Sequence, residues 1–277
     1  MTELGVVSDG AITATDAWRW AAASVAGSSH LRAGRGCDDA NIARPVTRAT
    51  GSPALVLAVS DGAGSARCSR EGAAAAVLAF AEAVEGMLQV KTLEDLPSVA
   101  SELLEAVRYQ VVLRAMDLGV ESRDCACTLL GAVLAQNKSF FLQVGDGAIV
   151  TRADEPGGMW QPVFWPQQGE YANTTYFVTQ PEAHSLALAQ FEDAPLAAIV
   201  LFTDGIQALC LDYASRTAHG PFFDYILEPV RHGLGRGHLE KSSQWLTDFL
   251  SSRQVNDRTD DDKTILVASK RCRDAAW

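Results

Sequence analysis

The chain has 277 residues, of which 48% are hydrophobic and 21% are charged. These fractions exclude wholesale disorder, a coiled coil and a collagen-like chain. Its 23 Lys and Arg residues against 34 Asp and Glu residues give a formal net charge of −11. That sign argues against a protein that holds nucleic acid or anionic lipid by neutralising phosphates, and it favours cations as inorganic ligands.

We expect neither export of the protein nor a segment that spans a membrane. The opening segment, MTELGVVSDGAITATDA, has neither a basic region nor a continuous apolar region, so it does not resemble a secretory signal. The apolar stretch at residues 73–81 ends at Glu82, well short of the roughly 18–20 residues that cross a bilayer. Six cysteines without a CxxC pair predict neither a disulfide framework nor a zinc knuckle. We therefore expect a cytoplasmic protein with reduced thiols.

Apolar periodicity and turn residues predict the elements of the first half. In chain order we expect a strand, a polar loop, a buried strand and two helices, at residues 17–25, 28–41, 55–59, 69–87 and 96–118. The second strand stops at Ser60-Asp61-Gly62, a sequence typical of a sharp turn. Ser69 is expected to be the N-cap of the first helix. The two helices are expected to pack together on one face of a sheet.

Short strands follow, and the last third returns to a mixture of helices and strands. An antiparallel meander is expected from strands at 128–135, 139–144, 148–152, 160–164 and 176–179. A buried strand, two helices and a closing strand are then expected at 196–202, 222–232, 239–251 and 264–268. Because helices and strands are grouped in blocks, the sequence predicts an α+β class with sheets flanked by helix pairs. No linker divides the chain, so we expect one domain over residues 1–277 with its core at about 17–269.

Two buried strands end in an aspartate followed by a glycine. LVLAVSDG ends at Asp61-Gly62, and AAIVLFTDG ends at Asp204-Gly205. Asp-Gly is also a favoured turn dipeptide, so a single copy is weak evidence for a site, and we interpret Asp146 in its Gly-Asp-Gly turn as structural rather than catalytic. Further acidic residues flank predicted strand ends at Asp38, Asp39, Asp260, Asp261 and Asp262. We hypothesise that these carboxylates converge.

Converging carboxylates need a counter-charge. Two unit charges about 5 Å apart at an effective dielectric constant of about 20 repel by roughly 3 kcal/mol. Oxygen ligands without His or Cys clusters favour Mg²⁺ or Mn²⁺ over structural zinc. Of the five histidines, only His30 lies in the polar loop expected at 28–41. Two such ions, bridged by one carboxylate, can hold a water between them and convert it to hydroxide, a nucleophile for phosphorus.

Six motifs in order resemble a known family. They are CDDAN at 37–41, SDGAGSA at 60–66, CTLLGAVL at 127–134, VGDGAIV at 144–150, FTDGIQAL at 202–209 and DDKTILV at 261–267. Together they are similar to the motifs of the metal-dependent protein phosphatases of the PP2C type (PPM family). GSSHLRAGRGCDDA before the first acidic pair and GEYANTT at 169–175 resemble a bacterial branch of that family. The resemblance implies a PP2C-like four-layer α/β/β/α sandwich of two antiparallel sheets flanked by helix pairs.

The resemblance also implies a two-metal centre that binds Mn²⁺ or Mg²⁺. Asp61 would bridge the ions, and the Gly62 carbonyl and Asp38 would serve one of them. Asp204 and Asp261 would serve the other, so Asp61, Asp204 and Asp261 are the expected catalytic residues.

Further site residues follow from the same resemblance. Arg35, slightly preferred over Arg32, is expected to grip the phosphate. Some bacterial relatives hold a third ion near the position of Asp124. A variable substrate flap is expected at about 165–195, containing Glu170, Tyr171 and Asn173.

Three departures from the family pattern bear on the site. Asp38 stands where many relatives have the longer Glu, so that its contact with an ion runs through water or passes to Asp39. Ala63 occupies a position where some relatives have a histidine, a candidate general acid. Asp262 replaces the usual asparagine and adds negative charge beside Asp261.

The expected function is hydrolysis of phosphoserine and phosphothreonine in proteins, by attack of a hydroxide that bridges the two ions. The substrate would be a phosphorylated protein with a cognate Ser/Thr kinase, and the enzyme a monomer. A hydrolase of the haloacid-dehalogenase type needs a second aspartate two residues from the Asp-Gly aspartate, and none is there. The remaining alternative is a catalytically weak PP2C-like module that binds a phosphoprotein or a regulatory partner.

Overall fold

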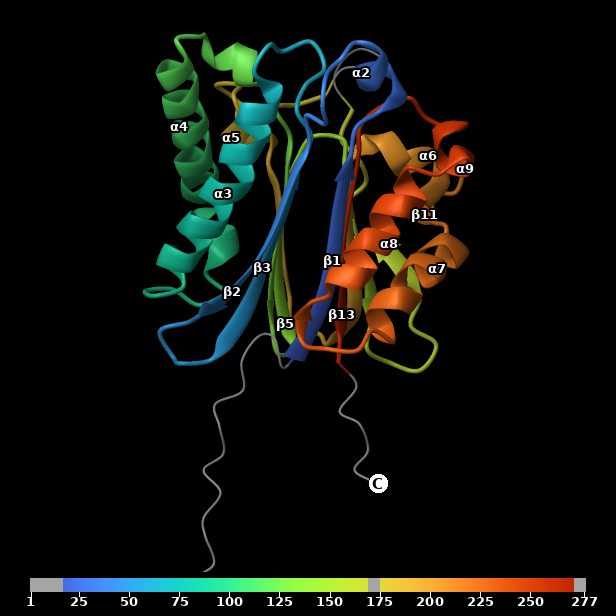
Figure 1. Cartoon of the computed structure of the whole chain (residues 1–277). Helices are drawn as coiled ribbons and strands as arrows, with labels where there is room; N and C mark the ends of the chain where they lie inside the picture. The colour runs from blue at the N-terminus through green and yellow to red at the C-terminus, as the bar shows by residue number, and fades with distance from the viewer. Residues whose placement is uncertain (1–16, 169–174, 272–277) are drawn as a thin grey trace, which may run out of the picture.

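Two β-sheets stack face to face, and a pair of long helices covers the outer face of each sheet (Figure 1). The computed structural model describes residues 17–168 and 175–271. One sheet has the strand order β2-β3-β4-β5-β8, and the other has the order β12-β1-β13-β9-β6-β7. A separate two-stranded ribbon pairs β10 with β11. This is the α/β/β/α arrangement that the sequence predicts.

The strands of the two sheets come from both halves of the chain. The five-stranded sheet contains β2 (Ala40–Thr47), β3 (Pro53–Ser60), β4 (Leu129–Ala135), β5 (Lys138–Val144) and β8 (Leu188–Glu192). The six-stranded sheet contains β12 (Gly237–His238), β1 (Trp18–Val25), β13 (Lys263–Lys270), β9 (Leu196–Phe202), β6 (Ala148–Ala153) and β7 (Trp160–Pro162). The ribbon contains β10 (Leu211–Asp212) and β11 (Thr217–Ala218). The strand pairs are antiparallel except for the short parallel pair of β1 with β12.

Four long helices form the outer layers. Helices α3 (Ser69–Met87) and α4 (Ala100–Leu118) cover the five-stranded sheet, and α7 (Gly220–Arg231) and α8 (Glu240–Leu250) cover the six-stranded sheet. The shorter helices are α2 (Ser28–Arg32), α5 (Ala183–Leu186), α6 (Gln207–Cys210), α9 (Arg253–Asn256), η1 (Leu96–Val99), η2 (Ser122–Cys125) and η3 (Asp204–Ile206). In the part of the chain that the structure describes, no helix has the length and apolar character needed to cross a bilayer.

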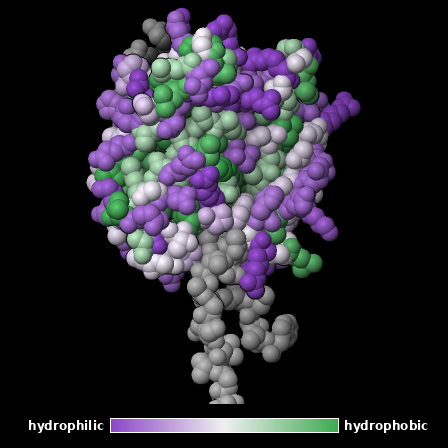
Figure 2. All heavy atoms as spheres, turned by 60° about the vertical axis from the view of Figure 1, so that its left-hand side comes forward, coloured by the Kyte–Doolittle hydropathy of each residue, from purple (hydrophilic) through white to green (hydrophobic). Residues whose placement is uncertain are grey.

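The central strands are apolar on both faces because both faces are covered. Along β3, Leu55, Leu57 and Val59 pack between the sheets, whereas Val56 and Ala58 pack under the helices. Burial of each such Leu or Val side chain stabilises the fold by about 1.5–3 kcal/mol. Continuous apolar runs therefore mark the central strands. On the face shown in Figure 2, hydrophilic residues surround apolar side chains that gather across its middle.

The predicted helices and most predicted strands are present, and three expectations about loops and strands are wrong. The expected loop at 28–41 contains α2, and it ends at β2, which the sequence analysis missed. Residues 176–179 form no strand; β8 adds to the sheet instead. The expected meander is broken because β4 and β5 pair in one sheet while β6 lies in the other, after a turn in which Gly145 adopts a φ of +110°.

Ser69 is not the N-cap of α3. Cys68 occupies the cap, and Ser69 is the first helical residue. Its hydroxyl donates to Asp38 Oδ2 at 3.0 Å, so it supports the acidic loop instead of the helix end.

Candidate functional site

Three aspartates from different strand ends meet at one end of the sandwich. Asp61 follows β3, Asp146 lies in the turn between β5 and β6, and Asp204 follows β9. One carboxylate oxygen from each lies within 4.8 Å of the others. Three ionised carboxylates at such separations repel one another strongly, so the cluster needs either protons or cations.

The backbone at Asp61 is fixed to the start of β4. The Asp61 N–H donates to Thr128 Oγ1 at 2.9 Å, and the Thr128 N–H donates to the Asp61 carbonyl at 2.8 Å. The next residue, Gly62, forms a β-bridge with Cys127. These reciprocal contacts hold the Asp61 carboxylate at the junction of two strands, where backbone freedom is small.

Asp39 joins this cluster from the loop before β2. Its side chain is 8% exposed, and Thr203 Oγ1 donates to its Oδ2 at 2.9 Å. Its other oxygen, Oδ1, is buried and has no hydrogen-bond partner among the described residues, and the same is true of Asp146 Oδ1. Buried carboxylate oxygens without a donor are costly unless a proton or a cation satisfies them.

The electrostatic consequence appears in the pKa values of these carboxyls. Burial raises the pKa of Asp39 and that of Asp204 to about 7. Burial, followed by the charges of Asp39 and Asp204, also raises the pKa of Asp61 well above its usual range, and burial raises the pKa of Asp146. A divalent cation bound at the cluster lowers these pKa values because it stabilises the ionised carboxylates.

Asp262 forms hydrogen bonds to the loop around α2. It is 3% exposed, and its carboxylate accepts from the backbone N–H groups of Gly27, at 2.6 Å, and Asp38, at 2.5 Å. Its Oδ2 also lies 2.9 Å from His30 Nδ1. Asp262 therefore fastens the loop around α2 to the start of β13.

Asp38 is not a member of the three-aspartate cluster. It is 6% exposed, pairs with the Arg35 guanidinium and accepts from Ser69 Oγ. Of the two alternatives that the sequence leaves open, the structure places Asp39, and not Asp38, beside Asp61.

The two candidate arginines differ in their surroundings. Arg35 contacts Asp38 and the Gly64 carbonyl, and its side chain is 39% exposed. Arg32 is 72% exposed and pairs with Asp260, also exposed, at 3.3 Å. Arg35 therefore lies at the acidic loop with its guanidinium partly open to solvent.

Asp261 lies at the rim of the cluster. It is exposed, and its charge contributes to the raised pKa values of Asp61 and Asp204. Its backbone carbonyl accepts from Nζ of the fully buried Lys263 at 3.3 Å. Burial lowers the pKa of that lysine.

The remaining expected site residues lie elsewhere. Asp124, in η2, accepts from Arg67 at 3.2 Å and belongs to none of the groups of potential metal ligands found in residues 17–168 and 175–271. Glu170, Tyr171 and Asn173 lie outside the described residues.

Asp146 is the site residue that the sequence analysis missed. It has the same signal as Asp61 and Asp204, an Asp-Gly at the end of a buried strand. The sequence analysis interprets Asp146 as a turn residue because it expects β5 and β6 to form a hairpin. Asp-Gly is a favoured turn dipeptide in hairpins, so it does not by itself indicate a site.

The donor set at this end of the sandwich fits hard divalent cations. It offers several carboxylate oxygens, two of which are buried without a hydrogen-bond partner among the described residues. Oxygen ligands of this kind suit Mg²⁺ and Mn²⁺.

Comparisons with known proteins agree with this arrangement. The profile of the family described as "Protein phosphatase 2C" matches residues 26–251. The chain is 35% identical over 257 residues to Serine/threonine-protein phosphatase 3 of Escherichia coli strain K12, covering 91% of this chain and 98% of the relative.

Two solved structures illustrate the likeness in fold. The catalytic domain of the serine/threonine phosphatase PstP in complex with two manganese ions has a TM-score of 0.57 at 16% identity, covering 92% of this chain and 99% of that chain. The phosphatase Stp1 from Staphylococcus aureus has a TM-score of 0.58 at 13% identity, with coverage of 97% and 99%.

Proposed function

The chain belongs to the protein phosphatase 2C family, and we propose that it is a metal-dependent phosphatase acting on phosphoserine and phosphothreonine in proteins. The observation that carries the proposal is the meeting of Asp61, Asp146 and Asp204 at one end of the sandwich, with Asp39 beside them. Four carboxyls with raised or mutually dependent pKa values mark a functional site more often than a structural one.

We assign the metal ligands with two changes from the sequence expectation. Asp61 and the Gly62 carbonyl would be among the residues that hold two Mn²⁺ or Mg²⁺ ions. Asp39 replaces Asp38, and Asp146 joins Asp204 and Asp261. When bound, the ions supply Lewis acidity that neutralises charge on the phosphate oxygens and lowers the pKa of water.

The protein's own groups position the substrate and the ligands. The Arg35 guanidinium, a planar fork of donors, suits two oxygens of one phosphate. Asp38 and the Gly64 carbonyl hold that guanidinium at the acidic loop. Thr203 orients Asp39, and Thr128 fixes the backbone of Asp61. These contacts exist before the substrate binds, so little reorganisation accompanies the reaction.

A module that binds phosphoproteins without turnover is the less favoured reading. Such a module would need only a surface that fits its partner, and it would still bind that partner after the loss of an acidic metal ligand. Here the acidic residues expected for catalysis, Asp61, Asp204 and Asp261, are present and close enough to perturb one another. This completeness supports catalysis.

Phosphate release in Mn²⁺ tests the proposal. The substrates are p-nitrophenyl phosphate and a phosphothreonine peptide, and the variants are Asp204→Asn and, as a control, Asp248→Asn on the exposed face of α8. Because electrostatic groups of an active site contribute about 10²–10³ in kcat, Asp204→Asn should lose at least about 100-fold while Asp248→Asn keeps the wild-type rate. Equal rates in all three proteins, or no activity in any, contradict the proposal.

We further propose that the substrates are phosphorylated proteins with an opposing Ser/Thr kinase, and that the enzyme acts as a cytoplasmic monomer. Light scattering of the purified protein tests the monomer, and a dimer mass at micromolar concentration contradicts it.

A further inference from the structure

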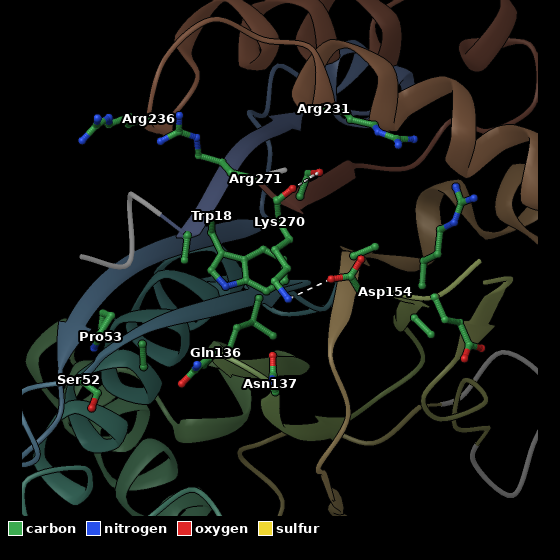
Figure 3. A pocket seen from close by; sticks show the side chains of 18 of the residues that line it. Trp18, Ser52, Pro53, Gln136, Asn137, Asp154, Arg231, Arg236, Lys270 and Arg271 are labelled. Carbon is green, nitrogen blue, oxygen red and sulfur yellow. Dashed lines mark hydrogen bonds and ion pairs between the residues drawn. The ribbon is translucent and has the colours of Figure 1, made fainter. Parts of the chain in front are cut away.

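A cavity of about 1400 Å³ opens at the end of the sandwich opposite to the aspartate cluster (Figure 3). Trp18 and Lys270, which pair where β1 begins and β13 ends, both line it. The other ends of these strands, at Val25 and Lys263, lead to the cluster. Seven residue steps of about 3.3 Å separate the two ends by roughly 23 Å, so the cavity is distinct from the proposed metal site.

Cationic side chains dominate the lining, although the whole chain has a net charge of −11. The lining cations are Arg48, Arg152, Arg231, Arg236, Lys270 and Arg271. The acidic residues of the lining are Asp154 and Glu155. Lys270 pairs with Asp154 at 3.0 Å, and Arg152 pairs with Asp224 at 2.9 Å, so these two cations are already compensated.

Three of the arginines are not compensated within the described part of the chain. Arg48, Arg231 and Arg271 form no ion pair there, and the Nε atoms of Arg48 and Arg271 are shielded from solvent without a hydrogen-bond acceptor. A shielded donor without an acceptor is unfavourable. An anion in the cavity supplies both the acceptor and the missing charge.

The rest of the wall is partly apolar. Figure 3 shows Trp18 between Arg271 and Arg236 on one side and the Lys270–Asp154 pair on the other. Trp18 is only 3% exposed, so it forms the buried floor of the cavity. Pro53 and Ala153 are half-buried and Pro156 is exposed, and these residues supply the accessible apolar surface of the wall. Ligand pockets of about 300–1,000 Å³ hold drug-sized molecules, so this cavity has room for a nucleotide-sized one.

We propose that this cavity binds a phosphorylated small molecule with an apolar or aromatic body, the class to which nucleotides belong. Guanidinium groups match phosphate oxygens in bidentate geometry, and the apolar part of the wall at Pro53, Ala153 and Pro156 receives the body. The ends of both sheets contribute to the walls, which suits a small molecule better than an extended protein surface.

Calorimetric titration of ADP in EDTA tests the proposal, because EDTA keeps divalent ions from the acidic cluster. The variants are Arg48→Gln and Arg231→Gln; Arg231 is exposed, so its variant should fold even if the first does not. Arg253→Gln is the matched control, since Arg253 is 92% exposed, pairs with Asp257 four residues later in the chain and does not line the cavity. Inorganic pyrophosphate is the second probe.

Wild-type protein and Arg253→Gln should bind ADP equally, and each cavity variant should bind it about tenfold more weakly, the loss typical of one charged hydrogen bond. Pyrophosphate should bind more weakly than ADP because it lacks the body. No ADP binding to the wild type at millimolar concentration, or unchanged affinity in Arg231→Gln, overturns the proposal. Pyrophosphate binding as tight as that of ADP overturns it too, since it indicates an adventitious anion only. None of these results depends on phosphatase activity.

Discussion

Asp262 Oδ2 lies 2.9 Å from His30 Nδ1, and the same carboxylate accepts from the backbone N–H groups of Gly27 and Asp38. These donors come from the loop around α2, whereas Asp262 immediately precedes β13. The loop carries Asp38 and Asp39, so one buried carboxylate determines how the first acidic pair meets the rest of the site. A carboxylate offers two acceptor oxygens, whereas an asparagine amide offers only one.

Asp262→Asn should therefore lower the free energy of unfolding by about 1–3 kcal/mol, because one buried N–H loses its acceptor. Asp260→Asn is the control: its partner Arg32 is exposed, and such a pair contributes at most about 1 kcal/mol. Urea unfolding in EDTA measures both. Equal stability of Asp262→Asn and the wild type contradicts the assignment.

The metal-free protein should lose stability as pH rises from about 4 to above 7. The carboxyls of Asp39 and Asp204 have pKa values of about 7 when folded, against about 3.9 in an unfolded chain. Between these values the folded state binds more protons than the unfolded state, so the free energy of unfolding falls with rising pH.

Asp204→Asn removes part of this dependence. In EDTA at pH 8 it should be more stable than the wild type by on the order of 1–3 kcal/mol, since each pKa unit corresponds to about 1.4 kcal/mol. Addition of Mn²⁺ should reverse the order. Denaturant unfolding at pH 5 and pH 8 checks both statements, and a wild-type stability that rises steadily to pH 8 in EDTA would be incompatible with them.

Arg35→Gln should raise KM for a phosphothreonine peptide by about tenfold, the cost of one charge-assisted contact to phosphate. Arg32→Gln is matched in chemistry and lies three residues away, but its guanidinium pairs with Asp260 at the exposed end of the loop. It should leave KM within about twofold of the wild type, as expected of an exposed pair. If Arg32→Gln has the larger effect in steady-state kinetics, the two assignments must be exchanged.

Gly205→Ala should destabilise the protein by about 1–3 kcal/mol, the usual cost of overpacking. A Cβ atom at Gly205 would lie 1.9 Å from the carbonyl oxygen of Asp262. Gly86 in α3 is the contrasting case, because a Cβ there meets no atom within 4 Å. Gly86→Ala should raise stability by about 0.5–1 kcal/mol. Thermal unfolding measures whether each variant is more or less stable than the wild type. A Gly205→Ala variant as stable as the wild type would contradict the predicted clash with the Asp262 carbonyl.

The layers could be predicted from sequence because the central elements have strong signals. Residues 54–59 of β3, 196–202 of β9 and 265–268 of β13 are continuously apolar, and the helices keep an apolar spacing. Edge strands were missed because one side of them has no neighbour: β2 contains Arg44 and Pro45 and is mostly half-buried, and β8 is half-buried throughout. Their pairing depends on tertiary contacts more than on intrinsic preference.

The acidic site was predictable in outline and not in detail. Strand ends located Asp61 and Asp204, but the choice between Asp38 and Asp39 depends on which side chain meets Thr203 and which meets Ser69. Those partners lie 164 and 31 residues away in the chain. Asp146 was left out because its turn connects two sheets rather than one hairpin.

Counting bound Mn²⁺ by calorimetry tests the central claim that the clustered carboxylates hold divalent ions. The wild type and Asp248→Asn should each bind two Mn²⁺ per chain, the number that the proposed two-metal centre requires. Asp61→Asn should lose both ions because it removes the shared ligand, and Asp146→Asn should bind Mn²⁺ more weakly. Undiminished binding of two Mn²⁺ by Asp61→Asn, or no binding by the wild type, would contradict the account.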